Sequence, residues 1–188
     1  MYVPRLFALP ADEIAPMVRA NPFATLFTSG SLGPYATHVP LLLDGPDRLV
    51  GHVARSNPHT ADLEGPALAV FAGPHAFVSS RWYGTPAEHV PTWNYVAVHA
   101  TGTLRRLEDP LPVLAASMAA FQPEDPIPSG DAERDDFVRN LSAAVVAFEL
   151  RVERWEGKAK LSQNRDPDDV ERVRAALDHE VAAWMGRR

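Results

Sequence analysis

Seven apolar segments, rich in β-branched or aromatic residues and separated by Gly, Pro, Asn and Asp, follow one another along most of the chain. Segments of this kind are typical of strands joined by turns. Apolar residues recur at alternate positions in two of them, as Val96, Val98, Ala100 and Leu104 and as Val146, Phe148, Leu150 and Val152. This is the pattern of a strand with one buried face. The chain is therefore predicted to form six or seven strands, over residues 24–29, 35–43, 48–54, 67–72, 76–79, 95–107 and 144–156.

Helical patterns are few and lie late in the chain or at its flanks. We predict helices over residues 12–19, 110–121, 131–141 and 167–185. The second begins with Asp109 and Pro110 as N-cap and first residue, and its expected apolar face is Leu111, Leu114, Met118 and Phe121. The last is capped by Asp166, and its helical repeat is Val170, Val173, Leu177, Val181 and Trp184. Strands that succeed one another predict a mainly β fold, a small antiparallel barrel with peripheral helices, and not a doubly wound sheet.

The composition describes one ordinary domain. The chain has 188 residues, of which 46% are apolar, and no Gly/Ser linker divides it, so we predict a single domain over residues 1–188. The absence of Cys excludes disulfides, thiolate metal sites and thiol catalysis. The longest stretch without a charged side chain, residues 20–43, contains prolines and polar residues and does not resemble a membrane span. With no leader-like apolar run at the N-terminus, a cytoplasmic location is expected.

Common catalytic and metal-binding motifs are missing from the chain. There is no GxGxxG after a strand, no GxxxxGK[ST], no GxSxG and no HExxH, which removes the main support for several enzyme classes. None of the seven histidines is paired with Asp or Glu at a tight ligand spacing, so no metal site is predicted. The net charge of −6 opposes non-specific attraction to nucleic acid.

Residues 52–59 form the first segment with candidate chemistry. A predicted strand ends at Arg55, Ser56 and Asn57 are suited to capping, and Pro58 would open a short helix that runs to Glu64. Backbone N–H groups at a helix start, a capping side chain and an Arg fork could together bind a phosphate. The alternative is a plain capped helix beside a solvated arginine.

Two further segments carry polar and aromatic groups. Residues 157–165 contain three cations and three neutral donors but no carboxylate, which suits a ligand with a phosphate and hydroxyls; the alternative is a solvated basic loop. Residues 79–95 hold two Trp and two Tyr among polar residues, which suits a planar heteroaromatic ring. Core or interface anchors are the alternative for these aromatic residues.

These segments resemble the PaiB family, whose members are FMN-binding split-barrel proteins related to pyridoxine 5′-phosphate oxidase. The resemblance rests on residues 1–4, 22–26, 36–40, 51–58, 90–95 and 157–165. The stretches VPTWNY (90–95) and KLSQNR (160–165) are specific, whereas ATHVP (36–40) and the Asn-Pro turn at 57–58 are supportive.

The resemblance implies a six-stranded antiparallel split barrel that forms a homodimer with FMN at the subunit interface. It places Thr37 and His38 near the flavin ring, His52, Arg55 and Ser56 at the phosphate, Trp93 and Asn94 near the flavin at the dimer contact, and Lys160, Ser162, Gln163 and Arg165 around the rest of the site. A dimer groove is physically reasonable, because a small barrel fills its own interior with side chains.

Two functions remain open at this point. The family resemblance implies a negative transcriptional regulator that acts through or senses a flavin. Direct binding to DNA is not expected, since acidic residues surround Arg172 and Arg174 in the last helix. The alternative is an FMN-dependent oxidoreductase that uses a nicotinamide donor, because a flavin needs no protein nucleophile. Haem or another planar cofactor in the same groove is a third possibility, based on fold analogy.

Overall fold

The computed structural model describes residues 1–177 and 180–187. Contacts within the chain group into two compact units. The first unit comprises Met1–Met17, Ala72–His99 and Glu156–Arg188, and the second comprises Val18–Phe71 and Ala100–Trp155. The expectation of a single domain stays a prediction. Within the described residues, no helix is both long enough and apolar enough to cross a membrane.

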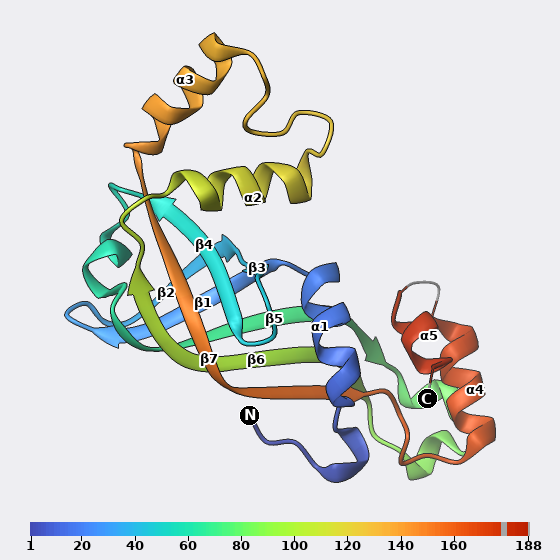
Figure 1. The fold of residues 1–188 in the computed structure, drawn as a ribbon. Coiled ribbons are helices and arrows are strands. Elements are labelled where there is room, and N and C mark those ends of the chain that lie inside the picture. Colours follow the sequence, from blue (N-terminus) through green and yellow to red (C-terminus); the bar gives the residue numbers. More distant parts are fainter. Residues whose placement is uncertain (178–179, 188) are drawn as a thin grey trace. The chain divides into compact units, whose positions relative to one another are not determined.

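The chain is mainly β, as predicted (Figure 1). Seven strands form one sheet in the order β2-β1-β5-β6-β7-β4-β3. The strands are β1 (Phe23–Gly30), β2 (Gly33–Pro40), β3 (Leu42–Leu43), β4 (Arg48–Ala54), β5 (Gly65–Val78), β6 (Thr92–Arg106) and β7 (Val145–Lys160). In the second unit, β1 pairs antiparallel with β2 and β5, and β4 pairs antiparallel with β3 and β7.

The strand count is seven, within the six or seven that the residue pattern predicts and one more than the family resemblance implies, and two predicted boundaries are wrong. The segment 35–43 divides at Leu41, whose N–H donates to the Pro22 carbonyl at 2.9 Å. The segments 67–72 and 76–79 form the single strand β5, which continues through Gly73 and Pro74. A Cβ atom at Gly73 would lie 2.7 Å from the Met17 Cε atom, so the missing side chain lets the strand pass close to its neighbours.

Three helices form close to their predicted ranges, and the second of them begins one residue later than expected, with Pro110 and not Asp109 as its N-cap. They are α1 (Ala11–Ala20), α2 (Leu111–Phe121) and α3 (Ala132–Ser142). The Asp109 Oδ1 atom accepts a hydrogen bond from the Leu111 N–H at 2.9 Å, and the Asp131 Oδ1 atom accepts one from the Glu133 N–H at 2.9 Å. No helix or strand lies between α2 and α3, as expected for this Pro-rich segment.

The α2 helix turns a different face to the sheet than the sequence predicted. Its buried residue is Val113, which belongs to a core cluster with Val50 and Ala147, whereas Phe121 is 51% exposed. The same packing explains why β7 is buried on both faces near Ala147, although its alternation predicted one buried face. Glu149 on β7 is also buried, because Arg48 and Arg151 both donate to its carboxylate.

The predicted C-terminal helix over residues 167–185 is two helices, α4 (Pro167–Ala176) and α5 (Glu180–Met185). Leu177 has an extended backbone with φ −99° and ψ 123°, which ends α4, and residues 178–179 of the predicted helix lie outside the described residues. Asp166 caps α4 as expected, accepting from the Asp168 N–H at 3.0 Å. The apolar repeat is buried at Val173, Leu177, Val181 and Trp184.

Candidate functional site

Arg55 has a fixed orientation at the end of β4 in the second unit. Its Nε atom donates to the Ala143 carbonyl at 2.7 Å and its Nη2 atom donates to the Val145 carbonyl at 2.9 Å. A guanidinium has five N–H donors, so three remain for another partner. Arg55 and Ser56 are both exposed. The pair therefore offers oriented donors to an anion.

The turn after Arg55 does not contain the helix expected to run to Glu64. Asn57 does cap, because its Oδ1 atom accepts from the His59 N–H at 2.9 Å, but the helix is a five-residue 3-10 helix, η2 (Pro58–Asp62). The Asp62 carboxylate is turned toward the β1–β2 connection, where it accepts from the Ser31 N–H at 2.9 Å and the Leu32 N–H at 3.2 Å. These backbone hydrogen bonds lower the pKa of Asp62. A helix this short contributes little dipole to an anion site.

The predicted residues on β2 and β4 point in different directions. Thr37 bonds to the Nδ1 atom of buried His59 at 2.7 Å, while the other ring nitrogen of His59 bonds to Thr28 at 2.8 Å. Exposed His38, the next residue, contacts Thr25 through its Nδ1 atom at 3.0 Å. Adjacent residues of a strand face opposite sides, so Thr37 and His38 do not share one face. His52 is half-buried, and burial lowers its pKa.

The VPTWNY and KLSQNR stretches meet in the first unit. The Lys160 Nζ atom donates to the Thr92 hydroxyl and, at 2.8 Å, to the Trp93 carbonyl. The buried side chains of Asn94 and Ser162 hydrogen-bond to each other, with the Asn94 Nδ2 atom 3.0 Å from the Ser162 Oγ atom. The two stretches most specific to the family resemblance are therefore joined directly within one chain.

Several donors of the KLSQNR stretch serve the turn itself. The Gln163 Oε1 atom accepts from the Leu161 N–H, and its Nε2 atom donates to the Ala159 carbonyl, both at 2.6 Å. Ser162 has a φ of +68°, a left-handed conformation that a residue other than Gly adopts at an energetic cost. Asn94, Ser162 and Gln163 thus hold the shape of this turn, which leaves Lys160 and Arg165 as its predicted cationic groups.

An exposed aromatic cluster lies beside these residues. It consists of His75, Phe77 and Trp93, with ring centroids 6.2 Å apart for His75–Trp93 and 6.0 Å apart for Phe77–Trp93. Trp93 is 50% exposed and Phe77 is 48% exposed. Sequence reasoning missed His75 and Phe77, although their alternation in β5 places both on one exposed face. The cluster offers an uncovered aromatic surface.

Three cations gather in the same unit, and we call them the cation group: Lys158, Lys160 and Arg165. Burial lowers the pKa of Lys160, and the positive charges of Lys158 and Arg165 lower it further. The sequence analysis counts Lys158 among the three cations of residues 157–165 but assigns it no site role. It is buried, and its Nζ atom donates to the Tyr2 carbonyl at 3.2 Å. Arg165 lies over the ring of Tyr83 and bonds to the Nδ1 atom of His89 at 3.1 Å.

The chemistry of these groups fits a flavin nucleotide. Mutual repulsion within the cation group is relieved when an anionic group binds beside it. An exposed Trp offers a face to a planar ring. Isoalloxazine with a phosphorylated side chain combines both properties. Among the described residues, no group of three or more His, Asp or Glu side chains could hold a metal ion.

The family model described as "Putative FMN-binding domain" matches residues 1–154. The protein named "Protease synthase and sporulation protein PAI 2" from Bacillus subtilis is 35% identical, over 96% of this chain and 90% of its own length. The uncharacterized protein YKL070W from Saccharomyces cerevisiae is 27% identical, over 74% of this chain and 99% of its own length.

Two solved structures show the same fold at low sequence identity. The FAD and heme binding protein from Mycobacterium smegmatis has a TM-score of 0.62 and 19% identity, over 88% of this chain and 78% of that one. The flavocytochrome Anf3 from Azotobacter vinelandii has a TM-score of 0.65 and 16% identity, over 95% of this chain and 80% of that one. The comparisons confirm the split-barrel fold class and, at the level of the family, the cofactor FMN. The chain belongs to the PaiB family of FMN-binding proteins.

Proposed function

We propose that this protein is a PaiB-like flavoprotein that binds FMN as a homodimer and acts as a transcriptional regulator through, or by sensing, the flavin. The observation that carries the proposal is the cation group beside the exposed aromatic cluster. Lys160 lies at the centre of this arrangement, since its Nζ atom contacts the carbonyl of Trp93 itself. The electron-rich carbonyl edge of the flavin ring at this position would offset part of the positive charge of the cation group.

The proposed contacts divide by role. Trp93 and Lys160 face the flavin ring, with Arg165 beside them, and Asn94, Ser162 and Gln163 hold the turn that carries them. Arg55 and Ser56 bind the phosphate, because three N–H groups of the fixed guanidinium remain for it. His38, His52 and Thr37 complete the proposed set. The hydrogen bond with buried His59 holds the Thr37 side chain in position.

An uncovered apolar face in the second unit supports the homodimer. Phe23 and Phe27 of β1 are 65% and 39% exposed. Phe27 is flanked across the sheet by Ala36 of β2 and Leu68 of β5. Exposed apolar patches of this kind mark interaction surfaces, and a twofold contact would cover the same face on both subunits. Phe27→Glu is expected to convert the dimer to a monomer in sedimentation velocity; an unchanged dimer would place the interface elsewhere.

Direct DNA binding is not part of the proposal. The cations of α4 are paired with carboxylates, Arg172 with Asp169 at 3.0 Å and Arg174 with Glu171 at 2.7 Å. Paired cations gain little by neutralising phosphates. Any regulation is therefore indirect. A gel shift with promoter DNA should show salt-sensitive, non-specific retention alone, and a specific complex that persists at physiological salt would contradict this.

A flavin oxidoreductase is the second candidate, and Lys160 is the observation that favours it. Bound FMN would supply one- and two-electron transfer. Lys160 would hold positive charge beside the ring, and its lowered pKa makes it a better proton donor than an ordinary lysine. Stopped-flow mixing of the FMN-loaded protein with NADH or NADPH separates the two candidates. Rapid flavin bleaching would support the oxidoreductase, and no bleaching with either donor would count against it.

Calorimetric titration with FMN and with riboflavin tests the assigned contacts. Arg55→Ala should weaken FMN binding by at least tenfold and riboflavin binding by less than twofold, because one charge-assisted contact contributes about 1.5–3 kcal/mol. Lys160→Met should weaken both ligands. Arg139→Ala on exposed α3 is the control and should change neither. Equal losses for both ligands with Arg55→Ala would refute the phosphate assignment, and no binding of FMN by the unmodified protein would refute the whole proposal.

A further inference from the structure

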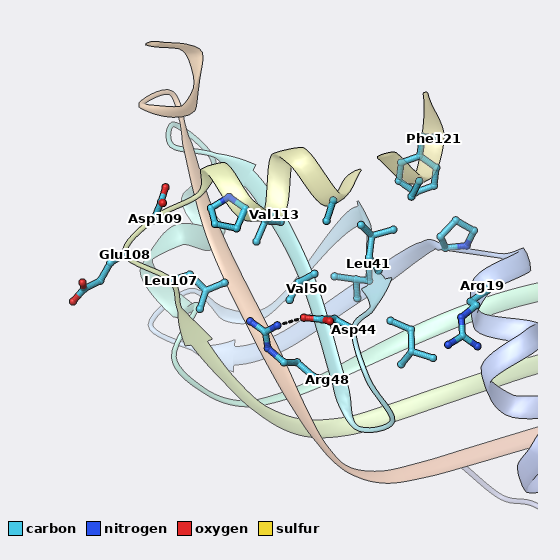
Figure 2. Close-up of a pocket in the computed structure, with 16 residues that line it drawn as sticks. Arg19, Leu41, Asp44, Arg48, Val50, Leu107, Glu108, Asp109, Val113 and Phe121 are labelled. Atoms are coloured by element: carbon cyan, nitrogen blue, oxygen red, sulfur yellow. Dashed lines mark hydrogen bonds and ion pairs between the residues drawn. The ribbon is translucent and has the colours of Figure 1, made fainter. Parts of the chain in front are cut away.

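A pocket of about 670 Å³ lies in the second unit between α2 and the strands β3 and β4 (Figure 2). Its lining is mainly apolar, and none of the eleven residues proposed for FMN lines it. The apolar side chains include Leu41, Leu42, Val50, Leu107, Val113 and Phe121. Sites for small organic molecules commonly have this size and apolar character.

Small residues on α2 create this space. Val113, Ala116 and Ala120, at helical spacings of three and four, line the pocket, and the helix has no charged residue. Val113 packs in the core cluster with Val50, which fixes the helix against the sheet. The two alanines are too short to fill the remaining gap. Because protein interiors are packed as densely as organic crystals, an apolar space of this size is suited to an occupant.

The charged side chains around the pocket differ in whether they are free to bind a ligand. Arg48 is held by Asp44 and by Glu149, so these groups neutralise one another. Asp109 accepts the Leu111 N–H as a helix cap. In Figure 2 the Asp109 side chain and that of its neighbour Glu108 point outward, away from Leu41 and Val50.

Arg19 is the charged side chain that can bind a ligand in this pocket. It extends from α1 at the end of the pocket near Phe121, opposite Glu108 and Asp109 (Figure 2). Within residues 1–177 and 180–187, no hydrogen bond or ion pair holds its guanidinium. A free cation at one end of an apolar pocket is complementary to a ligand that carries an anionic group at one end of an apolar chain or ring. We propose that this pocket binds a small amphipathic organic acid, with its apolar chain or ring between α2 and β3–β4 and its carboxylate on Arg19.

The test uses the purified full-length protein loaded with FMN and three probes of equal chain length: decanoate, decan-1-ol and decylammonium. Calorimetry should show decanoate binding at least tenfold tighter than either of the others. Arg19→Gln should remove this preference, weakening decanoate about tenfold or more and decan-1-ol less than twofold, since a charge-assisted contact is lost. Arg5→Gln, an exposed arginine on the 3-10 helix η1 (Arg5–Phe7), is the matched control and should change nothing.

A second variant tests the location. Ala116→Trp places a large side chain in the pocket and should weaken both decanoate and decan-1-ol at least tenfold without changing the affinity for FMN. If that variant does not fold, Ala120→Trp at the exposed end of α2 serves the same purpose. The proposal is overturned if decanoate binds no tighter than decylammonium, or if Arg19→Gln or the Trp variant leaves decanoate binding unchanged. It is also overturned if the Trp variant dissociates the dimer while no probe binds, because the occupant is then a second copy of the chain.

Discussion

The buried Asn94–Ser162 pair should be the energetic link between the VPTWNY and KLSQNR stretches. The side chain of Asn94 is fully buried, Ser162 is 3% exposed, and two hydrogen bonds of 3.0 and 3.2 Å join them. Removing Asn94 leaves the Ser162 hydroxyl buried without its partner, and removing Ser162 leaves the Asn94 amide with only the weakly accepting Met185 sulfur at 3.5 Å, which costs about 1–3 kcal/mol. We therefore expect Asn94→Ala to lower the free energy of unfolding by about 2–3 kcal/mol, because it also opens a small cavity, and Ser162→Ala to lower it by about 1–2 kcal/mol.

The double variant decides whether the two residues act as a pair. Once Asn94 is gone, removing the Ser162 hydroxyl breaks no further bond between them, so the double variant should lose about 1–2 kcal/mol less than the sum of the single losses. The measurement is urea unfolding followed by circular dichroism, with each free energy obtained by linear extrapolation. Additive losses, within about 0.5 kcal/mol, would refute the coupling.

Ser162→Gly separates the hydrogen bond from the backbone conformation. Both Ser162→Gly and Ser162→Ala remove the hydroxyl, but Gly accepts a φ of +68° without the penalty of about 1 kcal/mol that a Cβ atom brings. The glycine variant should therefore be more stable than the alanine variant by about that amount. If the alanine variant is the more stable of the two, the left-handed conformation does not govern this position.

Two further predictions concern the second unit. Burial lowers the pKa of His59 below its ordinary value of 6.5, so the unfolded chain takes up a proton first and stability should fall as the pH drops below about 6.5, by at most about 1.4 kcal/mol per pH unit. His59→Gln should show a shallower pH dependence in urea unfolding than the unmodified protein, and an equal slope would contradict this assignment. A Cβ atom at Gly102 would lie 1.9 Å from the Arg151 carbonyl oxygen, so Gly102→Ala should destabilise the protein by about 3 kcal/mol, and a melting temperature unchanged in calorimetry would refute this close approach.

The existence of the strands could be predicted from the sequence, because alternation of apolar residues survives in the folded state. Val96, Val98, Ala100 and Leu104 are all buried, as their spacing predicted. Boundaries and faces were harder, because they depend on partners far along the chain. Ala147 is buried by Val113 of α2, and β5 runs on through Gly73 because its missing side chain makes room for Met17. Contacts of this kind, between residues far apart in the chain, cannot be predicted from a local sequence pattern.

The helices show the same division between local and distant causes. The hydrogen bonds that Asp109 and Asp166 accept at helix starts could be predicted, because a capping carboxylate bonds to backbone groups two residues away. The face that α2 buries could not be predicted. In an apolar helix of eleven residues without a charge, several faces are equally apolar, so the sequence does not show which of them packs on the sheet. In the structure it is the face with Val113, and not the one with the bulkier Leu114 and Phe121.

For the candidate site, the sequence singled out segments dense in polar and aromatic groups but could not divide their residues by role. A segment dense in donors can bind a ligand or hold its own turn, and the composition is the same in both cases. The structure separates them through hydrogen bonding: Gln163 is engaged with its own backbone at both ends of its amide, whereas Lys160 joins Trp93 from within a group of mutually repelling cations. Part of this family signature therefore records loop geometry. Substituting Gln163 should change protein stability and FMN affinity together, whereas Lys160→Met should change mainly FMN affinity, so that the ratio of the two losses distinguishes residues that shape the turn from those that touch the flavin.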